Sequence, residues 1–337
     1  MTKCLSELGE FEAIRRLAQI VDPHADMLGD DCAIFADIAG VELAVSSDSM
    51  VEGVHFRLET IPADALGWKL YASTISDLAA MGAVPLGLLV AVQVPEDYSV
   101  EMLEGIYRGL KEASAIFGGR VVGGDVTRSN TPAFCATAFG VCRGKAVRRS
   151  GAQIGDDVWV SGTIGLSAAG LGVLEGQFDF GPADNKLAVE QHRRPHARVK
   201  LGQELAERKL ATSMIDVSDG LIQDAGHIAE MSRRTLQLSL NDIPTPAFEG
   251  HQGFDLVHAI SGGEDYELLF TASAKLRADV AQLTESQMVD GVALTRIGTV
   301  REASAAKVLV VDASGAELEV GQWLQDLGGR GGFEHFS

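Results

Sequence analysis

The sequence predicts an α+β protein of two domains, on three observations. Its 337 residues suffice for two domains of ordinary size. Helical and strand-like segments mix along the chain without the regular alternation of a doubly wound sheet. A polar, turn-rich stretch, RRSGAQIGDD at residues 148–157, divides two such mixed regions. We therefore expect an N-terminal domain over residues 1–150 and a C-terminal domain over residues 151–337.

In the first region, apolar residues at helical spacing predict helices, and apolar runs between turn residues predict strands. Gly82 ends one predicted helix and the pair Gly118-Gly119 ends another, since glycine readily adopts the conformation found just after a helix. The expected helices cover residues 10–21, 62–81 and 101–117, and the expected strands cover residues 41–46, 86–94, 120–122 and 133–142.

The second region continues the same mixture. Its basic stretch HRRPHARVK, residues 192–200, is predicted to be a loop that leads into a helix, although its cations could also contact phosphate. Pro195 interrupts the His-x₃-His spacing in this stretch, which argues against a pair of helical metal ligands. The expected strands cover residues 158–161, 213–216, 236–240, 266–270, 295–300 and 308–311, and the expected helices cover residues 167–175, 197–211 and 221–232.

The formal net charge of −19 and the pI of about 4.8 argue against nucleic acid as a partner. A phosphate-rich substrate would also be repelled unless cations intervened. The N-terminal segment is amphipathic and carries acidic residues, unlike a signal peptide, and the longest apolar run falls short of the ~20 residues that a membrane span needs. The four cysteines lack CxxC spacing, which fits reduced thiols. We expect a soluble, cytoplasmic protein.

Aspartates recur beside small residues where strands are predicted to begin or end. Asp30 and Asp31 precede a strand in LGDDCAIF, while Asp48, Asp125 and Asp216 follow predicted strands in AVSSDSM, VVGGDVT and MIDVSDGL. Taken alone, each of these aspartates would most simply cap a helix or close a turn.

Two further aspartates strengthen the pattern. Asp77 lies inside an otherwise apolar helix, and Asp219 precedes a helix that it could simply cap. Clustered carboxylates repel one another unless a cation neutralises them, and many hard oxygen ligands suit Mg²⁺ or Ca²⁺ better than zinc. The repetition therefore predicts a cation site that also binds phosphates. The sequence contains no Walker A motif, so a P-loop is not predicted.

Seven motifs together resemble the thiamine-monophosphate kinase family, which belongs to the superfamily of aminoimidazole ribonucleotide synthetase. In chain order they are GDDCA, SSDSMVEGVHF, SDLAAMGA, GGDVTR, RSGAQIGD, IDVSDGL and SGGEDYEL, and the resemblance runs from about residue 9 to the C-terminus. It implies two α/β-mixed domains of that superfamily's type and a homodimer in which the N-terminal sheets pair. It also implies transfer of the γ-phosphoryl group of ATP to thiamine monophosphate, with several Mg²⁺ ions.

The resemblance implies roles for individual residues. Asp48, Asp125 and Asp216 would be catalytic. The implied metal ligands are Asp31, Ser46, Ser47, Asp48, Asp77, Asp125, Asp216 and Asp219. The implied nucleotide contacts are Tyr107, Gly124, Asp125, Arg149 and Ser218. The implied thiamine contacts are His55, Glu264 and the C-terminal aromatic residue Phe333.

The chemistry of the implied contacts agrees with these roles, although each has a simpler alternative. A carboxylate such as Glu264 and an aromatic face suit the cationic thiazolium ring of thiamine, and the guanidinium of Arg149 suits phosphate. Taken alone, Glu264 would be a turn carboxylate, Arg149 a solvated arginine, His55 an ordinary loop residue and Tyr107 a residue of the core.

The acceptor that the resemblance implies is itself a phosphate. Its second pKa lies near ~6 by analogy with phosphoserine, so direct in-line transfer needs no general base. Three relatives in the superfamily are rival interpretations. Selenophosphate synthetase should carry a glycine-rich loop beside a reactive Cys–Lys pair, the hydrogenase-maturation relative should end in cysteine, and aminoimidazole ribonucleotide synthetase should lack SGGEDYEL. A sensor that binds ATP and Mg²⁺ without turnover is a further alternative.

Overall fold

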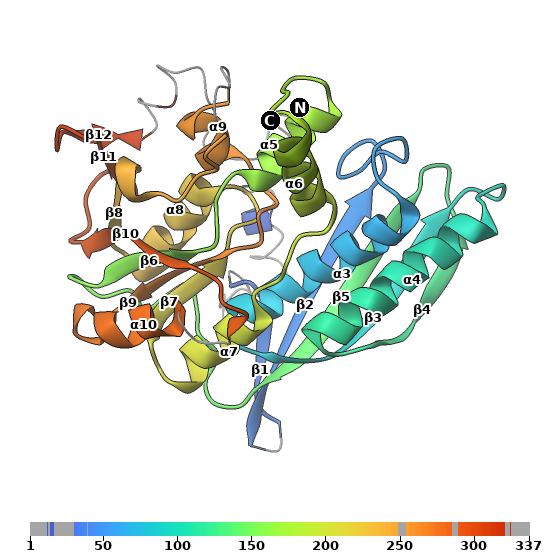
Figure 1. Ribbon diagram of the computed structural model, residues 1–337. Helices are drawn as coiled ribbons and strands as arrows, with labels where there is room; N and C mark the ends of the chain where they lie inside the picture. Colours follow the sequence, from blue (N-terminus) through green and yellow to red (C-terminus); the bar gives the residue numbers. More distant parts are fainter. Residues whose placement is uncertain are drawn as a thin grey trace, which may run out of the picture.

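The computed structural model describes residues 30–38, 40–248, 254–284 and 289–320, together with positions 12, 14–16 and 324. Two mixed sheets form the framework, and helices pack against each of them (Figure 1). Most of the helix predicted over residues 10–21 lies outside the described residues, and so does Phe333.

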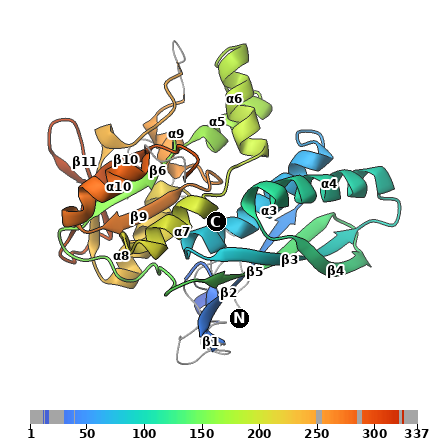
Figure 2. The same cartoon turned by 60° about the horizontal axis from the view of Figure 1, so that its bottom comes forward.

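The N-terminal sheet has five strands in the order β1-β2-β5-β3-β4. Helices α3 (Ala63–Ala80) and α4 (Val100–Phe117) cover one of its faces (Figure 2). Every second residue of β5 faces these helices, so that Phe134, Ala136 and Ala138 are fully buried. The strands are β1 (Ala33–Ile38), β2 (Val41–Val51), β3 (Val84–Val94), β4 (Val121–Arg128) and β5 (Ala133–Cys142).

The other face of this sheet carries no described helix (Figure 2). We call it the open face. Phe35 of β1, Leu89 of β3 and Val122 of β4 expose 46%, 44% and 48% of their surface, although they are apolar. Strand pairing sets Phe35 and Leu89 on the same side as Ser47 and Thr137. Within the part of the chain that the structure describes, the open face is therefore an apolar surface that no helix covers.

Two predicted strands are longer than expected, which corrects the placement of two aspartates. β2 continues to Val51 and β4 continues to Arg128, so Asp48 and Asp125 lie within strands and not after them. The glycines before Asp125 do not end the strand, because β4 pairs in parallel with β3 through Arg128. A Cβ at Gly124 would lie 1.9 Å from the carbonyl oxygen of Val90, so glycine is required for this close approach.

The C-terminal sheet has seven strands in the order β12-β11-β8-β10-β6-β9-β7. Helices α6, α9 and α10 and strand β12 were not predicted, because these elements are short or, in α6, largely polar. The strands are β6 (Asp157–Ser161), β7 (Ala211–Asp216), β8 (Thr235–Ser239), β9 (Leu268–Ala272), β10 (Leu294–Arg301), β11 (Val308–Val311) and β12 (Glu317–Glu319). The helices are α5 (Leu166–Leu174), α6 (Pro182–Arg193), α7 (Val199–Glu207), α8 (Leu221–Ser232), α9 (Leu256–Ser261) and α10 (Arg277–Thr284), with short 3₁₀ turns η1 (Leu240–Asp242) and η2 (Ala274–Leu276).

Helix α3 joins the two sheets, since it lies between α4 and the C-terminal part of the chain in both views (Figures 1 and 2). A Cβ at Gly202 of α7 would lie 2.0 Å from the carbonyl oxygen of Ala79, so α7 packs tightly on the end of α3. Trp68 of α3 donates a hydrogen bond of 2.7 Å to the carbonyl of Pro195. Within the described residues, every helix is too short or too polar to cross a membrane.

Candidate active site

Helix α3 is buried nearly all round, yet it carries a stripe of polar side chains. Lys69, Ser73, Ser76 and Asp77 follow one another at intervals that keep them on one side of a helix. Lys69 and Ser76 are fully buried and Ser73 is 2% exposed. Buried polar groups require hydrogen-bond partners, and here the partners come from both sheets. We call these residues the polar stripe.

Three carboxylates converge at the Asp77 end of the polar stripe. Oxygens of Asp31, Asp77 and Asp216 lie within 4.8 Å of one another, and Asp31 and Asp216 are buried. The Ser46 hydroxyl donates to Asp77, and the Ser76 hydroxyl donates to Asp216 at 2.6 Å. We call this group the carboxylate cluster. It joins the start of β1, helix α3 and the end of β7.

The cluster is electrostatically unfavourable without a cation. Burial, followed by the nearby Asp31 carboxylate, raises the pKa of Asp216 to about 8. Burial, followed by Asp216 and Asp31, raises the pKa of Asp77 well above its usual range. Like charges in a buried site hold protons or bind a cation. This oxygen donor set fits Mg²⁺ or Ca²⁺, as the sequence predicts.

Asp48 and His55 lie beside this cluster, towards the middle of the polar stripe. Burial raises the pKa of Asp48, while hydrogen bonds from the Ser49 amide and the Ser73 hydroxyl oppose the increase. Nδ1 of His55 accepts a hydrogen bond of 3.1 Å from the Val51 amide. His55 is close enough to Asp48 to lower the pKa of that carboxylate.

Arg149 is engaged with the cluster in this state. Its guanidinium makes contacts of 2.9 and 3.3 Å with the two carboxylate oxygens of Asp31. Asp30 accepts hydrogen bonds from the Arg149 amide at 2.7 Å and the Arg148 guanidinium at 2.9 Å. Asp30 therefore ties the start of β1 to residues 148–149, while Asp31 faces the cluster. The two adjacent aspartates therefore have different roles: Asp30 fixes the backbone at Arg149, and Asp31 belongs to the carboxylate cluster.

The loop after β7 brings Ser218 and Asp219 to the same region. Asp224 of α8 is buried and accepts the backbone amides of Ser218, Asp219 and Gly220 at 3.1 to 3.2 Å. Oxygens of Asp219 and Asp224 and a ring nitrogen of His227 form a second group whose atoms lie within 4.8 Å of one another. Asp224 thus fixes the loop that carries Ser218 and Asp219.

Glu264 lies at the Lys69 end of the polar stripe. A Cβ at Gly263 would lie 2.3 Å from the Ser218 carbonyl, and one at Gly262 would lie 2.3 Å from the Ala168 side chain. The two glycines let residues 262–264 pack against the Ser218 loop, and the Glu264 amide donates to the Ser218 carbonyl at 2.8 Å. The Glu264 carboxylate accepts a hydrogen bond of 2.8 Å from Lys69 Nζ.

Four of the predicted site residues stand apart from the cluster. Ser47 lies on the open face, where its hydroxyl bonds to Thr137 at 3.1 Å, on the opposite side of β2 from Asp48. Asp125 lies on the edge strand β4, three strands from β2, which is roughly 14 Å. Gly124 lies beside Asp125 in β4, and Tyr107 is exposed on α4, so its packing in the core is a wrong expectation.

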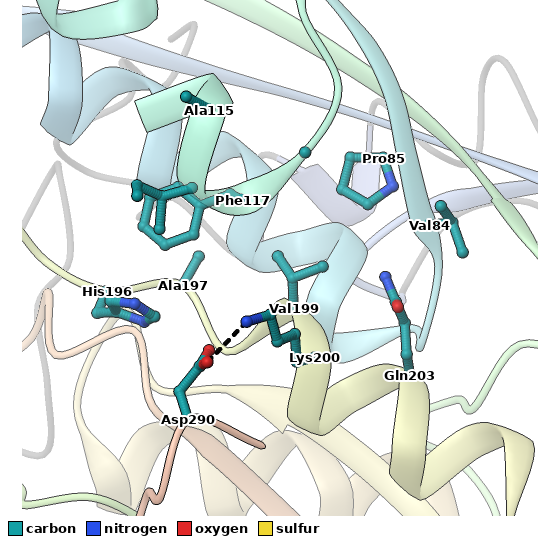
Figure 3. Close-up of a pocket in the computed structure, with 12 residues that line it drawn as sticks. Val84, Pro85, Ala115, Phe117, His196, Ala197, Val199, Lys200, Gln203 and Asp290 are labelled. Carbon is teal, nitrogen blue, oxygen red and sulfur yellow. Dashed lines mark hydrogen bonds and ion pairs between the residues drawn. The ribbon is translucent and has the colours of Figure 1, made fainter. Parts of the chain in front are cut away.

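Three of the four arginine and lysine side chains in the basic stretch over residues 192–200 pair with acidic side chains. Arg194 pairs with Asp64 and Glu112, and Arg198 pairs with Glu267. Helix α6 continues through His192 to Arg193, so the predicted loop begins two residues later, at Arg194. Part of this stretch lines a pocket of about 300 Å³. Lys200 pairs there with Asp290, with Nζ 2.7 Å from Oδ1 (Figure 3). Phe117 and His196 also line that pocket.

Sequence reasoning missed Lys69, Ser73, Ser76 and Asp224. The first three could have been found from their spacing, because polar residues at helical intervals inside an apolar helix mark a buried polar contact. Asp224 gave no comparable signal, since an acidic residue in the first turn of a helix is common.

Both halves of the chain match known families. AIR synthase related protein, N-terminal domain, matches residues 29–142, and AIR synthase related protein, C-terminal domain, matches residues 153–311. The chain is 37% identical to the thiamine-monophosphate kinase of Synechococcus elongatus, over 80% of this chain and 84% of that protein. It is 32% identical to the enzyme of Bacillus subtilis, over 90% and 94%. The chain belongs to the thiamine-monophosphate kinase family.

Solved structures agree with membership of this family. AaThiL complexed with AMPPCP and TMP is 30% identical and superimposes with a TM-score of 0.83, covering 99% of each chain. Thiamine-monophosphate kinase from Stenotrophomonas maltophilia K279a is 36% identical with a TM-score of 0.72, covering 88% of this chain and 94% of that one. The predicted α+β fold of two superfamily-type domains is confirmed. The hydrogenase maturation protein HypE, at 20% identity and a TM-score of 0.66, shares the fold alone.

Proposed function

We propose that this protein phosphorylates thiamine monophosphate to thiamine diphosphate, with ATP as the phosphoryl donor. The observation that carries the proposal is the polar stripe of α3, with the carboxylate cluster at one end and Glu264 at the other. The carboxylate cluster would bind a cation and, through it, the phosphates, and Glu264 would bind a cationic heterocycle. Membership of the family and the AaThiL complex support the same substrates.

We propose a single in-line displacement in a complex that holds both substrates. The acceptor oxygen belongs to a phosphate that is largely anionic at pH 7, so no general base is needed. Mg²⁺ held by Asp31, Asp48, Asp77, Asp216 and Asp219 would neutralise the charges of the two phosphate groups as they approach. Arg149 would exchange its contact with Asp31 for a phosphate oxygen, and Ser218 would contact the nucleotide.

Positions 55, 264 and 333 are proposed for the thiamine end. His55 and Glu264 both face Asp48 closely enough to influence its pKa, which supports one continuous site. Phe333 is proposed from the family resemblance alone. We also propose that the two domains divide within residues 148–157, since β5 ends at Cys142 and β6 begins at Asp157.

The decisive experiment supplies purified protein with ATP, Mg²⁺ and thiamine monophosphate and measures products by chromatography. Equal amounts of ADP and thiamine diphosphate are expected. ATP hydrolysis without thiamine diphosphate, or no turnover at all, would contradict the proposed function. Free thiamine in place of the monophosphate serves as the negative control, because it lacks the acceptor phosphate.

We further propose that the protein is a homodimer that pairs through the open face. Phe35, Leu89 and Val122 expose apolar surface there, and burying it between two copies is favourable. Asp125 lies on β4 at the edge of this sheet, so a second copy would lie near it.

Leu89→Glu should convert the dimer to a monomer, because it places a charge in the centre of the proposed interface. Light scattering coupled to size-exclusion chromatography measures the mass directly. Ile116→Glu, on α4 at 54% exposure, is the matched control and should leave the mass unchanged. A Leu89→Glu variant with the mass of the unchanged protein would exclude the open face as the interface.

A further inference from the structure

Lys69 is the one member of the polar stripe that carries a positive charge, and it is fully buried. Its Nζ lies 2.8 Å from Oε2 of Glu264 and 3.4 Å from Nε2 of His192. A buried ammonium with an anionic partner is stable only when both remain in place. Since Nζ has no exposed surface and these groups use its donors, Lys69 does not itself present a charge to a ligand.

His192 completes the arrangement from α6. An ammonium only donates, so Nε2 of His192 must accept and Nδ1 must carry the proton. Nδ1 lies 3.0 Å from the Ser167 hydroxyl and 3.6 Å from Oε2 of Glu264. Burial, followed by the charge of Lys69, lowers the pKa of His192 to about 3, which keeps the ring neutral. One oxygen of Glu264 therefore faces two groups that orient it.

The backbone of Glu264 does not fix the side chain by itself. Its φ of +65° is in the left-handed region, and two glycines precede it. Burial would raise the pKa of Glu264, but the ammonium of Lys69 keeps it below its ordinary value. The carboxylate is 27% exposed, whereas Lys69 and His192 behind it expose 0% and 9% of their side chains. The Glu264 side chain thus contacts Lys69 and His192 on its buried side and is accessible to solvent on its other side.

We infer that Lys69, oriented with His192 and Ser167, is a positioning residue that holds the Glu264 carboxylate towards the thiamine end of the acceptor. This inference rests on the proposed function and names further residues that determine its specificity for the acceptor. Along α3, Lys69 and Asp77 are eight positions apart, about 12 Å at 1.5 Å per residue. The helix thereby fixes the spacing between the carboxylate that meets the heterocycle and the cluster that meets the phosphates.

The test compares Lys69→Met, Glu264→Gln and the double variant by their KM values for each substrate. Lys69→Met should raise the KM for thiamine monophosphate about tenfold or more and change the KM for ATP less than twofold. The double variant should be no worse than the poorer single variant, because both substitutions remove one interaction. Lys200→Met, which breaks the exposed pair with Asp290, is the control and should change neither KM.

Ser167→Ala provides a milder test if Lys69→Met does not fold, since it removes only the hydroxyl that bonds His192. It should raise the KM for thiamine monophosphate alone, by a smaller factor. Equal changes in both KM values, no change, or additive effects in the double variant would overturn the inference while leaving the proposed function intact. If the protein without substitutions forms no thiamine diphosphate, the proposed function is wrong, and so is this inference.

Discussion

Asp48→Asn is expected to lower kcat by about three orders of magnitude or more while the protein stays folded. Asp48 lies within β2 beside the carboxylate cluster, and its neighbours include His55 and Glu264. The substitution keeps the shape of the side chain but removes one negative ligand, so the phosphates would meet a weaker cation site. Removal of a charge from a crowded acidic site also relieves repulsion. The melting temperature without cation should therefore be equal or higher.

Steady-state kinetics at several Mg²⁺ concentrations and a thermal melt measure both effects together. Asp97→Asn, at an exposed turn between β3 and α4, is the matched control and should change neither quantity. Near-normal turnover of Asp48→Asn at limiting Mg²⁺ would show that Asp48 is not a ligand. A large fall in the melting temperature would instead indicate a structural role.

The second large effect is a pH-dependent loss of stability that Mg²⁺ reverses. The folded protein raises the pKa of Asp216 from 3.8 to about 8. A carboxyl whose pKa is raised by folding stabilises the fold while it is protonated in both states, below its ordinary pKa. That contribution is lost as the pH rises through the folded value. Without a cation, the melting temperature should therefore fall between about pH 4 and pH 8.

Mg²⁺ should raise the melting temperature more at pH 8 than at pH 6, because it binds the ionised carboxylates. Calorimetry with EDTA or Mg²⁺ across this range measures the difference. Asp216→Asn should flatten the pH dependence and reduce the Mg²⁺ effect. If Asp216→Asn keeps the full pH dependence of the unchanged protein, the cluster is not its source.

The sequence predicted much of the carboxylate cluster because aspartates in unusual local contexts can be recognised from their neighbours along the chain. Asp31, Asp77 and Asp216 meet as expected, and Asp219 lies on a neighbouring loop. Sequence reasoning did not predict the orientation of the Ser47 side chain. With Asp48 placed after the strand, the alternation of side chains along β2 was not applied, and that alternation sends Ser47 to the opposite face from Asp48.

Other features of the fold and the site depend on contacts between distant segments. The parallel pairing with β3 extends β4 through Gly123 and Gly124, although these glycines, taken alone, predict the end of a strand. The pairing of Lys69 with Glu264 joins residues 195 positions apart. Nothing near either residue indicates the other. Helix α6 is polar and gives only a weak helical pattern, yet it supplies His192.

We propose that this site transfers a phosphoryl group directly between two phosphates. The most direct measurement mixes enzyme, Mg²⁺ and γ-labelled ATP, with and without thiamine monophosphate, and follows the label after an acid or base quench. We expect label in thiamine diphosphate when the acceptor is present and no labelled protein when it is absent. Stoichiometric label on the protein that then passes to added thiamine monophosphate would contradict it.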